Sequence, residues 1–224
     1  FASASNELGT QMKATGEVMG IGSTLSECML KSVRSLETGV NHLYISKFDK
    51  MTKEELFEYL TAFKHDNLFA IAELISRGAT IEEIHKVTMI TPLFLESIKR
   101  IIDMENVLKE NAFNLEELTK AKKMGFSDLF VARLWKCTEK EVSDFRKKNG
   151  LKPIFKMVDT LHAGAYIPYF YSSYTGENDS IITDKEKLIV LGAGPIRIGQ
   201  GVEFDYSTVH AATTIKKSGY EAII

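Results

Sequence analysis

The chain has few cysteines, no long apolar run and no excess of basic residues, and each shortage excludes a class of protein. Its only cysteines, Cys28 and Cys137, are far apart in the sequence and form no C-x-x-C pair. This usage suits a reducing compartment and supplies no metal site, so we interpret both as small core residues. No stretch approaches the roughly 20 apolar residues of a membrane-spanning helix. We therefore expect a cytoplasmic chain without a membrane partner.

The charges of the chain are nearly balanced. Lysine and arginine number 28 and aspartate and glutamate 30, which gives a formal net charge of -2 and a pI near 6.3. Nucleic acids and anionic membranes attract proteins that have a clear basic excess, so we expect no nucleic-acid partner. With 44% hydrophobic and 26% charged residues, the composition is that of an ordinary soluble protein with one large or two small domains.

Residues suited to catalysis or metal binding form no familiar motif. No histidine belongs to H-E-x-x-H, no serine belongs to G-x-S-x-G, and neither cysteine has a histidine nearby in the sequence. Helix surfaces or loops, rather than a metal, are the expected places of the histidines: His42, His65, His85, His162 and His210. We expect the chain to perform no chemistry alone and to hold no metal and no cofactor.

Helix start and stop signals occur throughout residues 52–150. An oxygen-bearing cap stands three residues before a glutamate at Thr52 and Glu55, Thr80 and Glu83, Asn114 and Glu117, and Thr138 and Glu141. Proline after Thr91 gives a further start. Three glycines supply stops: Gly78, Gly125 and Gly150. Strand signals are scarce in this region, so the sequence predicts a small all-α domain.

A shorter helical segment precedes this region. Thr24 with Glu27 forms a capping-box pattern that predicts a helix to about Leu36, before Gly39. Apolar residues recur along it every three or four positions and predict one buried stripe. The stripe consists of Leu25, Met29, Val33 and Leu36.

The helical region contains an internal repeat. The residues at 78–80 are echoed at 125–127, so the copies are offset by the 47 positions between Gly78 and Gly125. The same offset links Ile84 with Val131, Val87 with Leu134, Thr91 with Thr138, Leu95 with Val142 and Ile98 with Phe145. A constant offset between caps, stops and core positions predicts two copies of a helical hairpin, which pack against each other or across a dimer axis.

Beyond Gly150 the pattern changes from helical to extended. Residues 153–158 and 168–174 read as extended segments, and a polar stretch follows them to Asp184. This part resembles a connection between the helical domain and an α/β segment that begins near Lys187.

The last part of the chain reads as the start of a parallel α/β unit. Four apolar residues at 188–191, followed by glycines, predict a buried parallel strand. A helix from about Thr208 to Lys217 and a second strand from Tyr220 follow. Such a strand needs further parallel neighbours, and the first residue is not methionine. We therefore expect the chain to be part of a longer polypeptide.

The glycine turn after the first of these strands is of a kind that cradles phosphate. Glycines let backbone N–H groups approach an anion, and the next helix adds a favourable dipole. The spacing differs from a dinucleotide fingerprint, because Gly192 and Gly194 are followed by Gly199 and Gly201 rather than by a glycine at 197, and Pro195 removes a donor. The glycines alone therefore favour a structural turn over a nucleotide site.

Residues 131–142 allow a DNA-binding interpretation. They have the helix, short turn and capped second helix of a helix-turn-helix, and Lys147 and Lys148 add positive charge. The second helix begins with Glu139 and Glu141, however, and their negative charges oppose phosphate. A hairpin used for packing explains the same residues and is the interpretation that we favour, with a DNA-binding regulatory module as the alternative.

Three stretches in matching order resemble the large subunit of carbamoyl phosphate synthetase. They are residues 8–19 (LGTQMKATGEVM), the helical middle and residues 192–206 (GAGPIRIGQGVEFDY). In this family a helical oligomerisation domain joins two homologous ATP-grasp halves. The first half makes carboxyphosphate from bicarbonate and ATP and converts it with ammonia to carbamate, and the second phosphorylates carbamate.

The resemblance implies a mainly α chain in four parts. Residues 1–46 are then the tail of the carboxyphosphate half, 47–158 the helical oligomerisation domain, 159–186 a connector, and 187–224 the truncated α/β start of the carbamoyl phosphate half, before its ATP-grasp domain. The implied parent enzyme is a ligase that uses bicarbonate, ammonia from glutamine and two ATP for pyrimidine and arginine biosynthesis. This chain is expected to be inactive alone.

The resemblance also implies site residues and partners. The family's ATP-binding and magnesium-binding residues fall outside this chain, although the full enzyme uses both. Glu17 and Glu203 match glutamates associated with an internal passage for carbamate, where carboxylates orient water and accept hydrogen bonds from the carbamate nitrogen. By residue type alone, surface pairing is the default for Glu203. The implied partners are further copies of the helical domain and a glutaminase subunit or domain.

Overall fold

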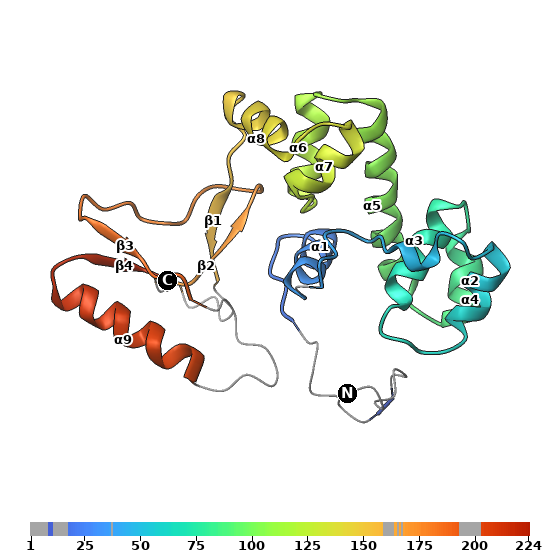
Figure 1. Cartoon of the computed structure of the whole chain (residues 1–224), viewed down its shortest axis with the longest axis horizontal. Helices are drawn as coiled ribbons and strands as arrows, with labels where there is room; N and C mark the ends of the chain where they lie inside the picture. The colour runs from blue at the N-terminus through green and yellow to red at the C-terminus, as the bar shows by residue number, and fades with distance from the viewer. Residues whose placement is uncertain are drawn as a thin grey trace.

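A computed structural model describes residues 9–10, 18–36, 38–158, 164, 166, 168–192 and 203–224. Helices dominate and the strands are few and short, so the prediction of a mainly α chain is confirmed (Figure 1). The helices are α1 (Leu25–Ser35), α2 (Lys53–Leu60), α3 (Asn67–Ser76), α4 (Ile81–Thr88), α5 (Pro92–Glu110), α6 (Leu115–Lys123), α7 (Asp128–Trp135), α8 (Glu139–Lys148) and α9 (Glu203–Lys217), with a 3-10 turn η1 (Ser46–Phe48).

The predicted starts and stops of these helices are present in atomic detail. Complete capping boxes start α2, α4 and α8 at Thr52, Thr80 and Thr138. Asn114 starts α6 by accepting two backbone N–H bonds, and α5 begins with proline after Thr91, whose side chain makes no capping bond. The predicted stop glycines Gly78, Gly125 and Gly150 adopt φ values of 80°, 92° and 73°, which glycine reaches at little cost.

Helix α1 differs from its predicted form in two ways. Thr24 accepts the backbone N–H of Glu27, but the Glu27 carboxylate accepts from Ser23 N instead of closing the capping box. The buried face is centred on Leu30 and Val33, and three of the four stripe residues predicted to be buried are only partly so: Leu25, Met29 and Leu36. The stripe is displaced because the buried face of α1 also includes the polar residues Ser26 and Glu27.

The internal repeat comprises three helices rather than two. The offset of 47 positions relates α3 to α6, α4 to α7 and the start of α5 to α8. It also relates two residues with positive φ, Met89 (56°) and Lys136 (55°), which end α4 and α7 in the left-handed conformation. Buried apolar residues occupy equivalent positions in the two copies: Ile71 with Leu118, Ile84 with Val131 and Leu95 with Val142.

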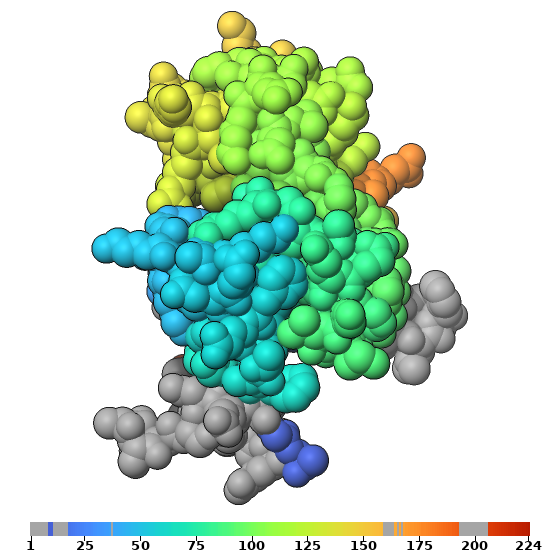
Figure 2. All heavy atoms as spheres, turned by 90° about the vertical axis from the view of Figure 1, so that its right-hand side faces the viewer, coloured from blue at the N-terminus to red at the C-terminus, as the bar shows by residue number. Residues whose placement is uncertain are grey.

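Helix α5 joins the two copies. It contacts α3 and α4 on one side and α6 and α7 on the other, and it runs between the two groups in Figure 1. Figure 2 faces the first copy, in cyan and green, with the second copy above it. A single hydrophobic core extends from Leu30 of α1 to Val142 of α8, so α1 packs with the helical domain as one body.

The strands form two separate pairs beside the helices (Figure 1). β1 (Ile154–Met157) pairs antiparallel with β2 (Phe170–Ser173), so the two predicted extended segments form one ribbon. β3 (Lys187–Ile189) pairs parallel with β4 (Glu221–Ile223), as predicted.

Two predictions for the last unit are wrong. Helix α9 begins at Glu203, before the predicted start near Thr208. The β3 segment was expected to be buried, but Leu188 is 44% and Ile189 68% exposed, because in the described part a single strand pairs with it.

Candidate functional site

The backbone that follows position 17 lies directly on helix α1. A Cβ added at Gly20 would lie 2.3 Å from the carbonyl oxygen of Cys28, and one added at Gly22 would lie 2.8 Å from the Glu27 carboxylate. Only glycine allows so close an approach. The position of this segment is therefore set by backbone-to-helix contact.

Glu27 and Lys31 fix this segment to α1. The carboxylate of Glu27, 1% exposed, accepts from Ser23 N at 2.7 Å and pairs with Lys31 Nζ at 2.9 Å. Lys31 Nζ also donates to the carbonyl of Ile21 at 2.8 Å. A buried carboxylate needs such partners, because its desolvation is otherwise costly.

Lys31 also reaches the connector. Its ammonium donates to the carbonyl of Ser172 in β2 at 2.5 Å and lies 5.2 Å from the centre of the Tyr171 ring. One side chain therefore contacts both the segment that follows position 17 and β2, the connector strand that pairs with β1.

A second charged group lies between α6, α7 and α8. The Asp128 carboxylate accepts from Lys122 Nζ and from Arg146 Nε, both at 2.7 Å, and Lys122 also donates to the Phe126 carbonyl. Burial would raise the pKa of Asp128, but the two cations outweigh it and the pKa is lowered. Burial is the main cause that lowers the pKa of Lys122.

Arg34 and Gly125 bring the two charged groups together. The Arg34 guanidinium donates to the Gly125 carbonyl at 2.8 Å, and burial lowers the pKa of Arg34 against the opposing charge of Glu27. A Cβ added at Gly125 would lie 3.0 Å from Glu27 Cα. The end of α6 thus packs tightly on α1. We call the six ionic residues the charged joint: Glu27, Lys31, Arg34, Lys122, Asp128 and Arg146.

The connector covers part of the charged joint. The Tyr174 ring lies 5.0 Å from Lys122 Nζ and 6.0 Å from Arg146 Cζ, within reach of cation–π attraction. Ser173 beside it is 2% exposed. The charged joint therefore holds three parts of the chain in one arrangement: the segment around α1, the helical repeat and the connector.

The arrangement suits positioning rather than bond chemistry. Its carboxylates are engaged by cations and backbone N–H groups, and neither is paired with a nucleophile. Within the described ranges, no three His, Cys, Asp or Glu side chains are grouped so as to hold a metal ion.

Only part of the predicted site falls among the described residues. Glu17, Gly194, Gly199 and Gly201 lie outside them, and Glu203 begins α9 with a side chain that is also outside the description. Gly192 is described: a Cβ there would lie 3.4 Å from Thr208 Oγ1 and 3.8 Å from Ile224 Cγ2. The passage roles of the two glutamates stay predictions.

Sequence reasoning missed the charged joint. The spacing of Glu27 and Lys31 by four positions was an available signal, because such pairs share a helix face. Nothing local links Lys31 to Ser172 or Arg34 to Gly125, since these contacts join residues far apart in the sequence.

The helix–turn–helix formed by α7 and α8 uses several of its charges internally. Arg146 binds Asp128, and Lys140 pairs with Asp144. Val142 is fully buried. These contacts favour the packing interpretation of the hairpin.

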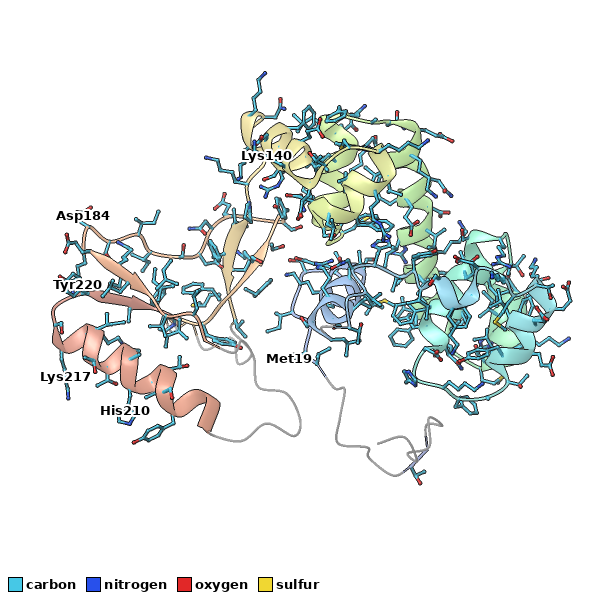
Figure 3. The ribbon with its side chains drawn as sticks, in the orientation of Figure 1. Met19, Lys140, Asp184, His210, Lys217 and Tyr220 are labelled. Carbon is cyan, nitrogen blue, oxygen red and sulfur yellow. The ribbon has the colours of Figure 1, made fainter. Side chains whose placement is uncertain are left out.

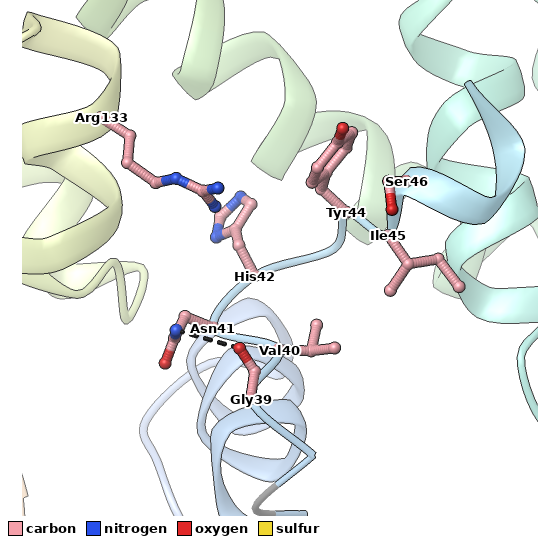
Figure 4. Close-up of a pocket in the computed structure, with 8 residues that line it drawn as sticks. All are labelled: Gly39, Val40, Asn41, His42, Tyr44, Ile45, Ser46 and Arg133. Carbon is pink, nitrogen blue, oxygen red and sulfur yellow. Dashed lines mark hydrogen bonds between the residues drawn. The ribbon is translucent and has the colours of Figure 1, made fainter. Parts of the chain in front are cut away.

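A small pocket of about 230 Å³ lies where residues 39–46 pass α7 (Figure 4). His42 and Arg133 are among the residues that line it. The imidazole of His42 stacks on Phe130 with 3.5 Å between ring centres, and its Nε2 lies 2.9 Å from Glu105 Oε1. Its buried Nδ1 has no hydrogen-bond partner among the described residues. His42 therefore occupies a loop, one of the two kinds of place predicted for the histidines, but its side chain is buried in the core.

We expect His42 to make stability depend on pH near neutrality. Burial lowers its pKa below 6.5, helped by Arg34 and opposed by Glu105. The unfolded chain therefore binds a proton at a higher pH than the folded chain does. As far as it depends on His42, the free energy of unfolding should be at its maximum above pH 6.5. Below pH 6.5 it should decrease, by at most about 1.4 kcal/mol per pH unit. Urea denaturation between pH 5 and 8 measures this slope.

The His42→Gln variant should lose this slope. The exposed His65 supplies the matched control, because His65→Gln removes a histidine without touching the core. A slope that is unchanged in His42→Gln and weakened in His65→Gln would contradict the assignment.

Among the helices that the structure describes, none has the length and apolar character needed to cross a membrane.

Comparison with protein families identifies two parts of the chain. Residues 17–150 match the family described as carbamoyl-phosphate synthetase large chain, oligomerisation domain. Residues 184–224 match the family described as carbamoyl phosphate synthase preATP-grasp domain. The two matches follow one another along the chain and together include α1, the helical repeat and the β3–α9–β4 unit. The chain belongs to the carbamoyl-phosphate synthetase large-chain family, a family of ligases.

Proposed function

We propose that this chain is the joint between the two synthetase halves of a carbamoyl phosphate synthetase and that it self-associates through its helical repeat. The observation that carries the proposal is the charged joint, in which Lys31 contacts both the backbone after position 17 and the connector strand β2. Such contacts hold the segment after position 17 and the connector in a fixed relative position and take no part in the reaction.

The proposal divides the chain as its resemblance implies. Residues 1–46 end the carboxyphosphate half, 47–158 form the oligomerisation domain, 159–186 connect, and 187–224 begin the carbamoyl phosphate half. The family description of residues 17–150 as an oligomerisation domain supports self-association. We further propose a glutaminase subunit or domain as partner of the full enzyme, a cytoplasmic location, and a role in pyrimidine and arginine biosynthesis.

ATP and magnesium belong, in this proposal, to parts of the enzyme outside this chain. The described residues do not fit a magnesium site, because they include no cluster of three or more potential ligands. Residues of this chain are instead proposed to line a passage for carbamate, with Glu17 and Glu203 as the lining carboxylates.

Replacing either passage glutamate in the full enzyme tests this proposal. Glu17→Ala and Glu203→Ala should reduce carbamoyl phosphate synthesis at least about tenfold, because loss of a charge-assisted hydrogen bond to the intermediate is worth roughly 1.5–3 kcal/mol. The bicarbonate-dependent ATPase should change much less, since it precedes carbamate formation. Both rates are measured on the same preparation.

Exposed Glu139 provides the control, because it lies at the start of α8. Glu139→Ala should leave both rates unchanged. Equal loss of the two activities in the Glu17 and Glu203 variants would argue for a structural role and against the passage.

A further inference from the structure

The turn between α4 and α5 carries a patch of exposed apolar side chains. Met89 is 75% exposed, Leu93 58% and Phe94 47%, and Val87 at the edge is 37% exposed. We call these four residues the α4–α5 patch. Their exposed parts add up to an apolar area on the order of 400 Å², the size of the largest patch on a typical monomer and often functional.

The second copy of the repeat shows that the fold does not require apolar residues here. The positions equivalent to Met89, Leu93 and Phe94 are occupied by Lys136, Lys140 and Glu141. All three are exposed, and Lys140, labelled in Figure 3, pairs with Asp144 along α8.

The backbone is similar in the two copies at these positions. Met89 and Lys136 have nearly equal φ values, 56° and 55°, and Leu95 and Val142 after them are both fully buried. Two similar local structures therefore carry a charged surface in one copy and an apolar surface in the other. Exposing large apolar side chains opposes solubility, so the difference points to a contact made only by the first copy.

The charges around the α4–α5 patch are of both signs. Glu82 and Lys86 are exposed on α4, and Glu96 and Arg100 are exposed on α5, where they lie 3.7 Å apart. A mixed rim is compatible with a surface that meets an identical copy of itself, because a two-fold contact allows acidic residues of one copy to face basic residues of the other. A strongly charged partner would instead require a rim of the opposite sign.

We propose that the α4–α5 patch is the self-association surface of this chain and that its occupant is the same patch of a second copy. This inference rests on the proposed self-association and names its site. Two such patches face to face supply about half of the roughly 800 Å² that each partner buries in a standard interface, and the mixed rim supplies further area.

The repeat itself suggests the variants that test this proposal. Met89→Lys, Leu93→Lys and Phe94→Glu install the residues that the second copy carries on the same backbone, so the fold should tolerate them. Sedimentation equilibrium of the wild-type chain should show dimers, and the triple variant should have a dimer dissociation constant at least about 30-fold higher. Circular dichroism confirms that the helix content is unchanged.

Leu129 on α7, 38% exposed, gives the matched control. Leu129→Glu installs the residue found at the equivalent position 82 of the first copy and should leave the dissociation constant within about twofold. If the triple variant dimerises as tightly as the wild-type chain, the assignment of self-association to the α4–α5 patch is overturned, while self-association itself stands. A wild-type chain that stays monomeric at high concentration would overturn the proposed self-association as well and make another polypeptide the occupant.

Discussion

Replacing Asp128 with asparagine is expected to lower the free energy of unfolding by about 3–5 kcal/mol. The carboxylate is the shared partner of Lys122 and Arg146, with 2.7 Å contacts to both. The Lys122 side chain is 6% exposed, so water cannot replace the lost charge. Removing one member of a buried ion group leaves an uncompensated charge in a poorly solvated site, which costs more than the group contributes when intact.

Urea denaturation followed by circular dichroism measures this effect. Asp144→Asn is the control, because Asp144 pairs with Lys140 on the surface, where both side chains are more than half exposed. Exposed pairs contribute at most about 1 kcal/mol, and this variant should lose no more than that. Equal losses in the two variants would show that the site around Asp128 is effectively solvated.

The Asp128 contacts also predict a dependence on acid. Its pKa in the folded chain lies below 3.8 because Lys122 and Arg146 outweigh burial. The stabilisation is therefore present above about pH 4 and lost as the pH falls through the pKa of the folded state. Wild type should lose stability in this window, and Asp128→Asn should lose less there, because the titrating group is absent.

The helical part of the fold could be predicted from the sequence because its signals are local. Thr52, Thr80 and Thr138 form capping boxes over three residues, and the stop glycines act at single positions. The sequence did not indicate that α3 and α6 are also equivalent helices of the repeat, and the reason is physical. Helix α3 is apolar and α6 is rich in lysine and glutamate, so their relationship is visible in backbone and burial rather than in residue type.

The candidate site could be predicted only in part. Its charged joint depends on contacts between distant segments, such as Lys31 with Ser172 and Arg34 with Gly125, which no periodic pattern encodes. The displaced stripe of α1, in contrast, has a local origin. A helix normally buries apolar residues, and here burial of Glu27 is made possible by Lys31 and by Ser23 N. Glu17 and Glu203 were predicted from resemblance, and their role awaits the activity measurements.

The two stop glycines of the repeat permit a test of how tightly α1 is held. Gly78 and Gly125 occupy equivalent positions with φ values of 80° and 92°, so alanine is strained at both by about 1–2 kcal/mol. Their surroundings differ. A Cβ at Gly78 would meet no atom within 4 Å, whereas one at Gly125 would lie 3.0 Å from Glu27 Cα and 3.3 Å from its carbonyl oxygen.

Gly125→Ala is therefore expected to lower the free energy of unfolding by about 1–3 kcal/mol more than Gly78→Ala, because overpacking is added to the backbone strain. The atoms in the way belong mainly to the backbone of α1, so they can yield only if the helix moves. Such a movement would displace Glu27 and, with it, the contacts of Lys31 to Ile21 and Ser172. Urea denaturation of the two variants measures the difference. Equal losses would mean that α1 shifts freely, and the charged joint could not then hold the segment after position 17 in place.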